Sequence, residues 1–127
     1  MHIEHLAIWC EDLEKERLFY EKYFAFKSTD KYVNPKKGFS SYFLKSADNA
    51  CRLELMHKEV IDTRLRSELL GFAHFAIALG SKELVDTLTE TLKNDGYEIK
   101  GEPRTTGDCY YESVVLDPEG NLLELTV

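Results

Sequence analysis

Two histidine–glutamate pairs occupy matching places in the two halves of the sequence. His5 opens the stretch His-Leu-Ala-Ile, and His74 opens the similar stretch His-Phe-Ala-Ile. Glu54 lies within Arg-Leu-Glu-Leu-Met, and Glu124 lies within Leu-Leu-Glu-Leu-Thr. Because both matches recur at nearly the same spacing, the sequence indicates an internal duplication that carries one pair in each copy.

The four side chains are typical ligands of a divalent metal ion. Imidazole nitrogens and carboxylate oxygens suit nickel, zinc, cobalt or manganese, and such a set leaves positions open for water or substrate oxygens. A glutamate between leucines also needs compensation, because an unpaired buried carboxylate is costly. Any one of these residues alone is more often structural than a ligand, so the prediction of a catalytic metal site depends on the repeated set.

The elements that position these residues follow from the periodicity of the apolar side chains. Each half reads as a strand, a helix and three further strands. The predicted strands span residues 2–9, 27–33, 39–45, 50–57, 72–79, 97–102, 109–116 and 121–127. Asp12 and Ser81 are the predicted N-caps of the two helices, and Gly96 follows the second. The apolar stripe of that second helix is predicted as Leu84, Leu88 and Leu92.

Strand alternation assigns the candidate site to one face of each sheet. Leu53 and Leu55 share the apolar face of their strand, which places Glu54 on the other face, and the last strand repeats this pattern around Glu124. His57 falls on the face away from Glu54, so we predict that neither it nor the terminal His2 is a ligand. Four further residues are candidate substrate contacts, with plain packing as the alternative: Trp9, Arg52, Tyr42 and Tyr110.

The predicted organisation is a single α+β domain, residues 1–127, made of two βαβββ modules. The first module covers about 1–57, a connector about 58–70 and the second module about 71–127. Turns are predicted at 34–38, 48–49 and 117–121. A helix covers only one face of each mixed sheet, so the other faces should meet and form a cup. The modules can pair within one chain or across a dimer, and the sequence leaves both open.

Composition limits the kinds of partner. The chain has 127 residues with a net charge of −7, which disfavours nucleic acid and anionic membrane surfaces and leaves a small molecule as the expected partner. No basic segment precedes an apolar one at the N-terminus, and no apolar run approaches a membrane span, so a cytoplasmic location is expected. The three cysteines lack metal-binding spacing and are predicted to be reduced structural thiols.

These motifs together resemble the vicinal oxygen chelate superfamily, which includes lactoylglutathione lyases, bleomycin resistance proteins and dioxygenases. The resemblance covers the whole chain, from HLAIWCEDLEKERLFYEKYF through GFAHFAIAL to DPEGNLLEL. It is closest to the glyoxalase I group, whose four ligands correspond here to His5, Glu54, His74 and Glu124. Thiol transferases and extradiol dioxygenases of the superfamily use three ligands, without the carboxylate that corresponds to Glu54.

The resemblance implies a metal-dependent lyase or isomerase that acts on a hemithioacetal or a similar substrate with adjacent oxygens. Glu124, with Glu54 as the alternative, would transfer a proton between neighbouring carbons through a metal-stabilised enediolate. A homodimer is also implied. Trp9 stands where several bacterial relatives have an arginine that contacts glutathione, so the thiol stays open. Another metal-dependent enzyme of the superfamily and a protein that sequesters a small molecule or drug are the alternatives.

Overall fold

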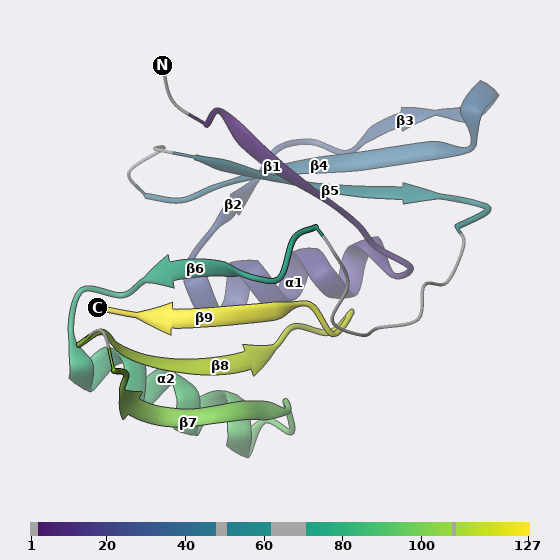
Figure 1. Cartoon of the computed structure of the whole chain (residues 1–127). Coiled ribbons are helices and arrows are strands. Elements are labelled where there is room, and N and C mark those ends of the chain that lie inside the picture. The colour runs from purple at the N-terminus through teal and green to yellow at the C-terminus, as the bar shows by residue number, and fades with distance from the viewer. Residues whose placement is uncertain (1–2, 48–50, 62–70, 108) are drawn as a thin grey trace. The chain divides into compact units, whose positions relative to one another are not determined.

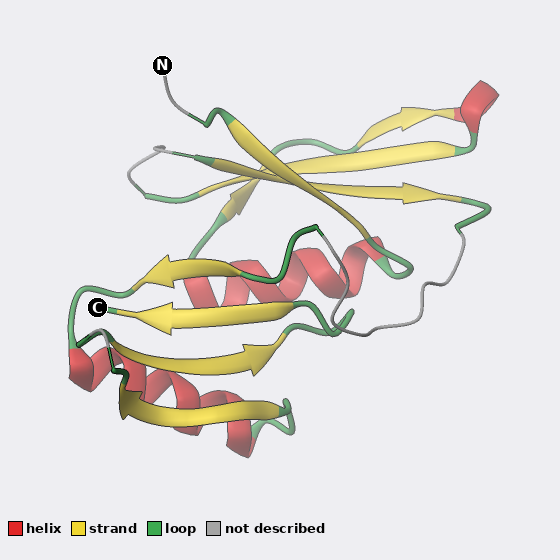
Figure 2. Cartoon of the chain, in the orientation of Figure 1, coloured by secondary structure: helices red, strands yellow, loops and turns green. Residues whose placement is uncertain are grey.

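The computed structural model describes residues 3–47, 51–61, 71–107 and 109–127. The chain divides into two compact units, Met1–Leu65 and Arg66–Val127. Each unit contains one mixed sheet and one long helix, as Figures 1 and 2 show. The predicted α+β class is therefore confirmed, and the boundary between the units falls inside the predicted connector 58–70. Most of that connector, the predicted turn 48–49 and His2 lie outside the described residues.

The first unit is built around a sheet in the order β1-β5-β4-β2, with β3 also paired to β4. The parallel pair β1–β5 lies at one edge, and the other pairs are antiparallel. Its elements are β1 (His5–Trp9), α1 (Leu13–Phe24), β2 (Lys27–Ser28), β3 (Tyr32–Asn34), the 3₁₀ helix η1 (Pro35–Lys37), β4 (Phe39–Lys45) and β5 (Arg52–Lys58). The single strand predicted at 27–33 is thus two short strands. Thr29 still donates a backbone hydrogen bond to Phe43 of β4 at 2.9 Å, but the register shifts before Tyr32 pairs with Ser41, which interrupts the ladder.

The second unit has a sheet in the order β6-β9-β8-β7. Here β6 and β9 form the parallel pair, which makes the topology of this sheet correspond to that of the first. Its elements are β6 (Phe75–Ala78), α2 (Lys82–Asn94), β7 (Ile99–Thr105), β8 (Tyr111–Leu116) and β9 (Leu122–Thr126). Figure 1 shows α2 running alongside this sheet. The predicted repeat of one helix and a strand set is confirmed in both halves.

Both helices begin at the predicted caps. The side chain of Asp12 accepts a hydrogen bond from the backbone N–H of Lys15, and that of Ser81 accepts one from Leu84. Each cap satisfies a backbone donor that has no partner within the helix. Gly96 follows α2 with a φ of 89°, a conformation that side chains other than glycine rarely adopt. None of the described helices is long and apolar enough to cross a membrane.

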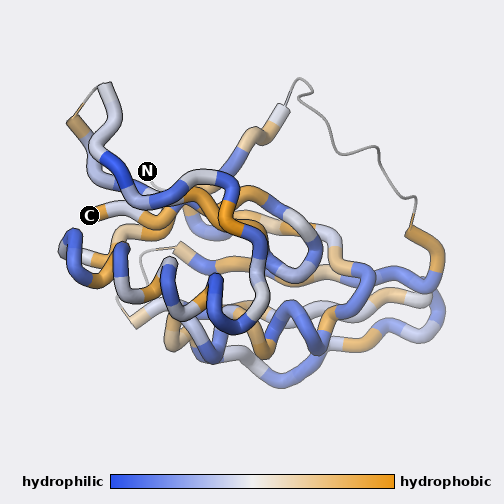
Figure 3. Tube along the Cα trace, turned by 90° about the horizontal axis from the view of Figure 1, so that it is seen from below, coloured by the Kyte–Doolittle hydropathy of each residue, from blue (hydrophilic) through white to orange (hydrophobic). Residues whose placement is uncertain are grey.

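The hydrophobic core of each unit lies between its helix and the apolar face of its sheet. Leu53 and Leu55 of β5 are buried, as are Leu123 and Leu125 of β9, which confirms the predicted alternation. Figure 3 shows hydrophilic and hydrophobic residues alternating along the trace. The predicted stripe of α2 is wrong by one position at two of its three residues. Leu84 is exposed and Leu88 is half-buried, and the residues that α2 buries are Val85, Thr89 and Leu92.

Candidate metal centre

The first histidine–glutamate pair is held by two neighbouring parallel strands. In the register of β1 and β5, His5 lies beside Arg52 and Ala7 lies beside Glu54. Alternation puts all four side chains on the face opposite the buried leucines. The small side chain of Ala7 leaves room next to the carboxylate, and His5 Nε2 lies 3.9 Å from Glu54 Oε2.

The second pair repeats this arrangement. His74 immediately precedes β6, and Ala76 lies beside Glu124 of β9 in the parallel register. His74 Nε2 lies 3.3 Å from Glu124 Oε2. An alanine of the histidine strand again lies beside the carboxylate, so the two pairs correspond in residue type, strand position and register.

The spacing within each pair suits a shared cation. Two ligand atoms that each lie about 2.1 Å from one ion at tetrahedral or octahedral angles are about 3.0–3.4 Å apart. The His74–Glu124 separation falls in this range, and the His5–Glu54 separation is slightly wider. The carboxylates are the shielded members, 16% and 21% exposed, whereas the imidazoles are 40% and 47% exposed. The negative charge of a carboxylate that is shielded from water and faces an imidazole nitrogen is compensated better by a divalent ion than by solvent.

Each unit supplies only one pair. Among the described residues, no group of three or more histidine, cysteine, aspartate or glutamate side chains is close enough to hold a metal ion. The prediction that all four residues bind one ion stays a prediction.

His5 has a carboxylate neighbour that sequence reasoning missed. Its Nδ1 lies 2.5 Å from Glu4 Oε2, and the other oxygen of Glu4 pairs with the guanidinium of Arg52. The hydrogen bond from His5 lowers the pKa of Glu4, and Arg52 adds to this effect. An ionised carboxylate only accepts hydrogen bonds, so Glu4 offers an acceptor to His5 Nδ1, and Nε2 is the ring nitrogen on the side of Glu54. The position of Glu4 directly before His5 is the signal in the sequence.

The candidate substrate contacts lie in different places. Trp9 is on the same face as His5, with its ring edge-to-face against Phe39 and partly exposed, and Tyr110 is exposed before β8. Arg52 is on this face too, but its guanidinium is bound to Glu4. Tyr42 is not on this face: it is paired with Leu55 in the register, and its hydroxyl donates to Glu14 of α1. The predicted place of Tyr42 as a substrate contact, on the sheet face away from the helix, is therefore corrected.

His57 is also on the helix-covered face, as predicted. Its Nδ1 lies 2.9 Å from the backbone oxygen of Cys10, which explains its place without a metal. Cys10 is buried, Cys51 and Cys109 are exposed, and none of the three forms a disulfide.

Comparison with models of protein families identifies the superfamily of the chain. The model of the glyoxalase/bleomycin resistance protein/dioxygenase superfamily matches residues 2–125. The chain belongs to this superfamily. The predicted resemblance is thereby confirmed at the level of the superfamily, which includes enzymes and binding proteins and does not by itself give the reaction.

Solved structures agree on the fold of this superfamily member. Glyoxalase I from Zea mays is 26% identical, with a TM-score of 0.79, and the match covers 98% of this chain but only 44% of the maize chain. A glyoxalase family protein from Enterococcus faecalis is 23% identical, with a TM-score of 0.81 over 99% of this chain and 97% of that one. A superfamily domain from Frankia reaches a TM-score of 0.85 at 16% identity, covering 100% and 97%. No curated protein gives a significant match.

One turn of this superfamily member positions the strand that carries Glu124. The buried Asp117 accepts hydrogen bonds from the backbone N–H groups of Glu119 and Asn121 at 3.1 and 2.7 Å, and from the Asn121 side chain at 2.8 Å. Gly120 closes the turn with a φ of 75°. The turn predicted at 117–121 is confirmed, and it fixes where β9 begins.

Replacing Asp117 should therefore cost stability. Asp117→Ala removes the acceptor of three hydrogen bonds in a turn whose other residues are half-buried, so we expect the free energy of unfolding to fall by about 1–3 kcal/mol. Urea denaturation followed by circular dichroism measures this loss. Asp117→Asn keeps one acceptor oxygen and should lose less. Equal stability of Asp117→Ala and the unmodified chain would show that the turn does not depend on this carboxylate.

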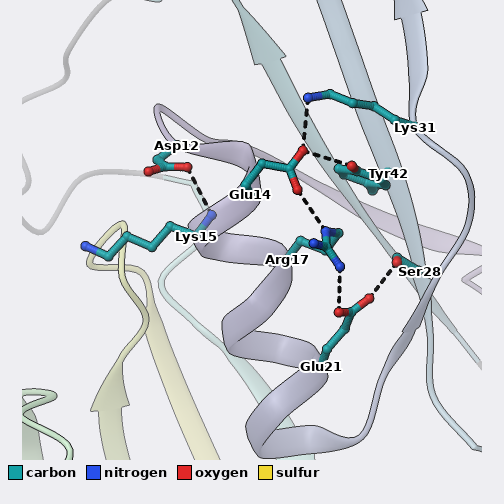
Figure 4. Close-up of polar contacts among 8 residues, drawn as sticks. All are labelled: Asp12, Glu14, Lys15, Arg17, Glu21, Ser28, Lys31 and Tyr42. Atoms are coloured by element: carbon teal, nitrogen blue, oxygen red, sulfur yellow. Dashed lines mark hydrogen bonds and ion pairs between the residues drawn. The ribbon is translucent and has the colours of Figure 1, made fainter.

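A second polar cluster that sequence reasoning missed ties α1 to the sheet (Figure 4). Lys31 Nζ and the Tyr42 hydroxyl lie 3.0 and 2.9 Å from Glu14 Oε1, and Arg17 Nε lies 3.0 Å from Glu14 Oε2. Arg17 also bonds Glu21, which accepts from Ser28. Burial would raise the pKa of Glu14, but the hydrogen bonds from Lys31, Tyr42 and Arg17 outweigh it and lower the pKa to about 2.

The lowered pKa of Glu14 predicts how stability changes in acid. A carboxylate with a depressed folded-state pKa stabilises the fold above its unfolded-state pKa of 4.5, and this contribution is lost as the pH falls toward about 2. Because the side chain is 46% exposed, screening limits the effect, and we expect roughly 1 kcal/mol at neutral pH. The difference in unfolding free energy between the unmodified chain and Glu14→Gln should disappear across this window. A constant difference from pH 7 to pH 2 would contradict the assignment to Glu14.

Proposed function

We propose that the protein is a divalent-metal-dependent lyase or isomerase of the glyoxalase I type. The observation that supports this most is the repeated histidine–glutamate pair, which has the same register in both units. The superfamily membership and the likeness to glyoxalase I from Zea mays support the same reaction class. The substrate would be a hemithioacetal or another small molecule with two adjacent oxygens.

The metal would be held by His5, Glu54, His74 and Glu124. The donor set of two nitrogens and two oxygens suits nickel, zinc, cobalt or manganese and leaves positions for the two substrate oxygens. When bound, the ion would supply Lewis-acid stabilisation of the negative charge that develops on those oxygens.

Proton transfer would be the task of a glutamate in this set. Glu124, with Glu54 as the alternative, takes the proton from one substrate carbon and returns it to the neighbouring carbon. Both carboxylates are shielded from water on their sheet faces, which favours return of the same proton over its exchange with solvent.

The sheet face that carries Glu54 favours a substrate with an apolar or aromatic part. Trp9, Phe39 and Tyr32 form a chain of ring contacts, with centroids 6.3 and 6.1 Å apart. In the register, Trp9 and Tyr32 belong to the same row of paired residues, on the face that carries Glu54. Trp9 offers no positive charge to a glutathione carboxylate, and Arg52 is already bound to Glu4. The same ring cluster favours a second candidate function, the binding of a small aromatic molecule without turnover.

Turnover with defined substrates tests the proposal. Metal-loaded protein is mixed with methylglyoxal and, in turn, glutathione, cysteine and coenzyme A, and product formation is followed after addition and removal of each metal. We expect at least one thiol adduct to be converted in a reaction that a chelator stops and that added metal restores. Thermal stabilisation by an aromatic ligand, without turnover under any metal, would favour the binding protein instead.

The complete site also predicts an assembly. We propose a homodimer, in which paired units bring the two histidine–glutamate pairs to one ion. Sedimentation of the metal-loaded protein measures the molecular mass directly. A monomer with full activity would exclude a site shared between chains.

A further inference from the structure

The two histidine–glutamate pairs differ in the residues that support the histidine. His5 has three supporting side chains within its own unit: Glu4, Arg52 and Phe43. The imidazole bonds Glu4 through Nδ1, and its ring stands edge-to-face on Phe43 with centroids 5.4 Å apart. These contacts restrain the plane of the ring and place a carboxylate acceptor beside Nδ1.

Arg52 connects the other two supports. Its guanidinium lies over the Phe43 ring, 4.2 Å from the centroid, and pairs with Glu4 through Nη2. Its backbone N–H also donates to the backbone oxygen of Glu4 at 3.0 Å. A planar guanidinium that stacks on an aromatic ring while it binds a carboxylate has few other positions available, so Glu4 is held in place beside His5.

The register of the second unit shows what occupies the matching positions there. Ala73 precedes His74 as Glu4 precedes His5. Val114 is the β8 partner of Glu124, as Phe43 is the β4 partner of Glu54. Leu122 stands two residues before Glu124, as Arg52 stands before Glu54. All three supports are replaced by aliphatic side chains. These can neither accept a hydrogen bond from an imidazole N–H nor offer an aromatic ring to the imidazole.

We propose that Glu4, Arg52 and Phe43 are positioning residues that hold His5 ready for metal binding, whereas His74 has no matching support among the described residues and is ordered by the metal. The metal-binding part of this inference rests on the proposed function. The part that concerns the tautomer of His5 does not, because it describes the metal-free protein. The two halves of the duplicated site are therefore unequal despite their matching ligands.

Nitrogen-15 NMR of the metal-free protein tests the tautomer directly. The spectra are recorded at a pH where the imidazole signals no longer change with added base, and the two-bond correlations to the ring protons then show which nitrogen is protonated. We expect His5 to carry its proton on Nδ1 and His74 to show the commoner Nε2–H form, with single substitutions to glutamine used to assign the signals. In Glu4→Ala, His5 should change to the Nε2–H form. Protonation of His5 on Nε2 in the unmodified protein would overturn the proposal.

Titration with Co²⁺ tests the consequence for metal affinity. Loss of an outer carboxylate typically weakens metal binding 10–100-fold, and we expect about tenfold for Glu4→Ala because Glu4 is half-exposed. Arg52→Leu, which introduces the residue of the second unit, should weaken binding by several-fold for the same reason. Glu4→Gln keeps an oxygen that accepts a hydrogen bond from Nδ1–H and should retain most of the affinity for Co²⁺. Glu11→Ala removes another exposed carboxylate of the first unit and serves as the matched control.

The outcomes separate this inference from the proposed function. Equal Co²⁺ affinity in Glu4→Ala, Arg52→Leu and Glu11→Ala would overturn the positioning role even if the protein binds metal tightly. Failure of the unmodified protein to bind Co²⁺, Ni²⁺, Zn²⁺ or Mn²⁺ would defeat the proposed function. In that case the NMR measurement still decides whether Glu4 fixes the tautomer of His5.

Discussion

The double variant Glu54→Ala, Glu124→Ala is expected to lose its metal. Gently purified unmodified protein should contain about one divalent ion per site, and the variant less than about a tenth of that, because only two imidazoles remain to bind it. Elemental analysis of both proteins measures the difference. The matched control, Glu11→Ala with Glu90→Ala, removes one exposed carboxylate from each unit and should keep the metal.

The same variant gives a second readout through its stability. Removing two partly shielded carboxylates removes their desolvation cost, so the metal-free variant should be at least as stable as the metal-free parent. Added metal should stabilise only the parent, by about 2.7 kcal/mol at a hundred times its dissociation constant. Equal stabilisation of both proteins by metal would show that the ion binds elsewhere.

Exchanging one glutamate at a time for glutamine should identify the residue that moves the proton. An amide oxygen can still bind a metal ion but cannot accept a proton, so Glu124→Gln should lower turnover by about 10²–10⁴-fold while metal remains bound. Glu54→Gln should have a smaller effect if it acts mainly as a ligand. Turnover is measured with the substrate found among the thiol adducts, and metal content is measured in the same samples.

Exchange with solvent distinguishes a lost base from a disturbed site. In deuterium oxide, the product of the unmodified enzyme should carry little deuterium at the carbon that receives the proton, because the shielded glutamate returns it. A variant that reacts through water should incorporate more. Unchanged rates in both glutamine variants, with metal bound, would contradict the assignment of either glutamate as the base.

Much of the fold could be predicted because its signals are local or repeated. The caps Asp12 and Ser81 act on the first turn of their helices, and the leucines around Glu54 mark the buried face of a strand. The duplication then linked elements that are far apart in the sequence. This is why the order of helices and strands in both units, apart from the split at 27–33, and the buried leucine faces of β5 and β9 agree with expectation.

What could not be predicted depends on neighbours that the pattern does not reveal. Tyr42 lies in a strand with polar and aromatic residues on both faces, so its side was settled only by pairing with Leu55. In α2, both Leu84 and Val85 are apolar, and only packing against the sheet selects Val85 as the buried one. The contact between Glu4 and Arg52 joins the residue before β1 to the first residue of β5, and the register of these two strands could not be read from the sequence. The convergence of all four candidate ligands stays a prediction.

Alternate residues of β5 and β9 have two different roles, one in the hydrophobic core and one on the opposite face of the sheet. One set of side chains, the leucines, secures the hydrophobic core, and the other set, around Glu54 and Glu124, faces away from it. Exchanges in the outward set therefore alter chemistry at little cost to folding, and the same scaffold can serve as an enzyme in one protein and as a ligand carrier in another. Exchanges are most restricted at Ala7 and Ala76. A bulkier side chain at either position would crowd the adjacent carboxylate while leaving the core intact.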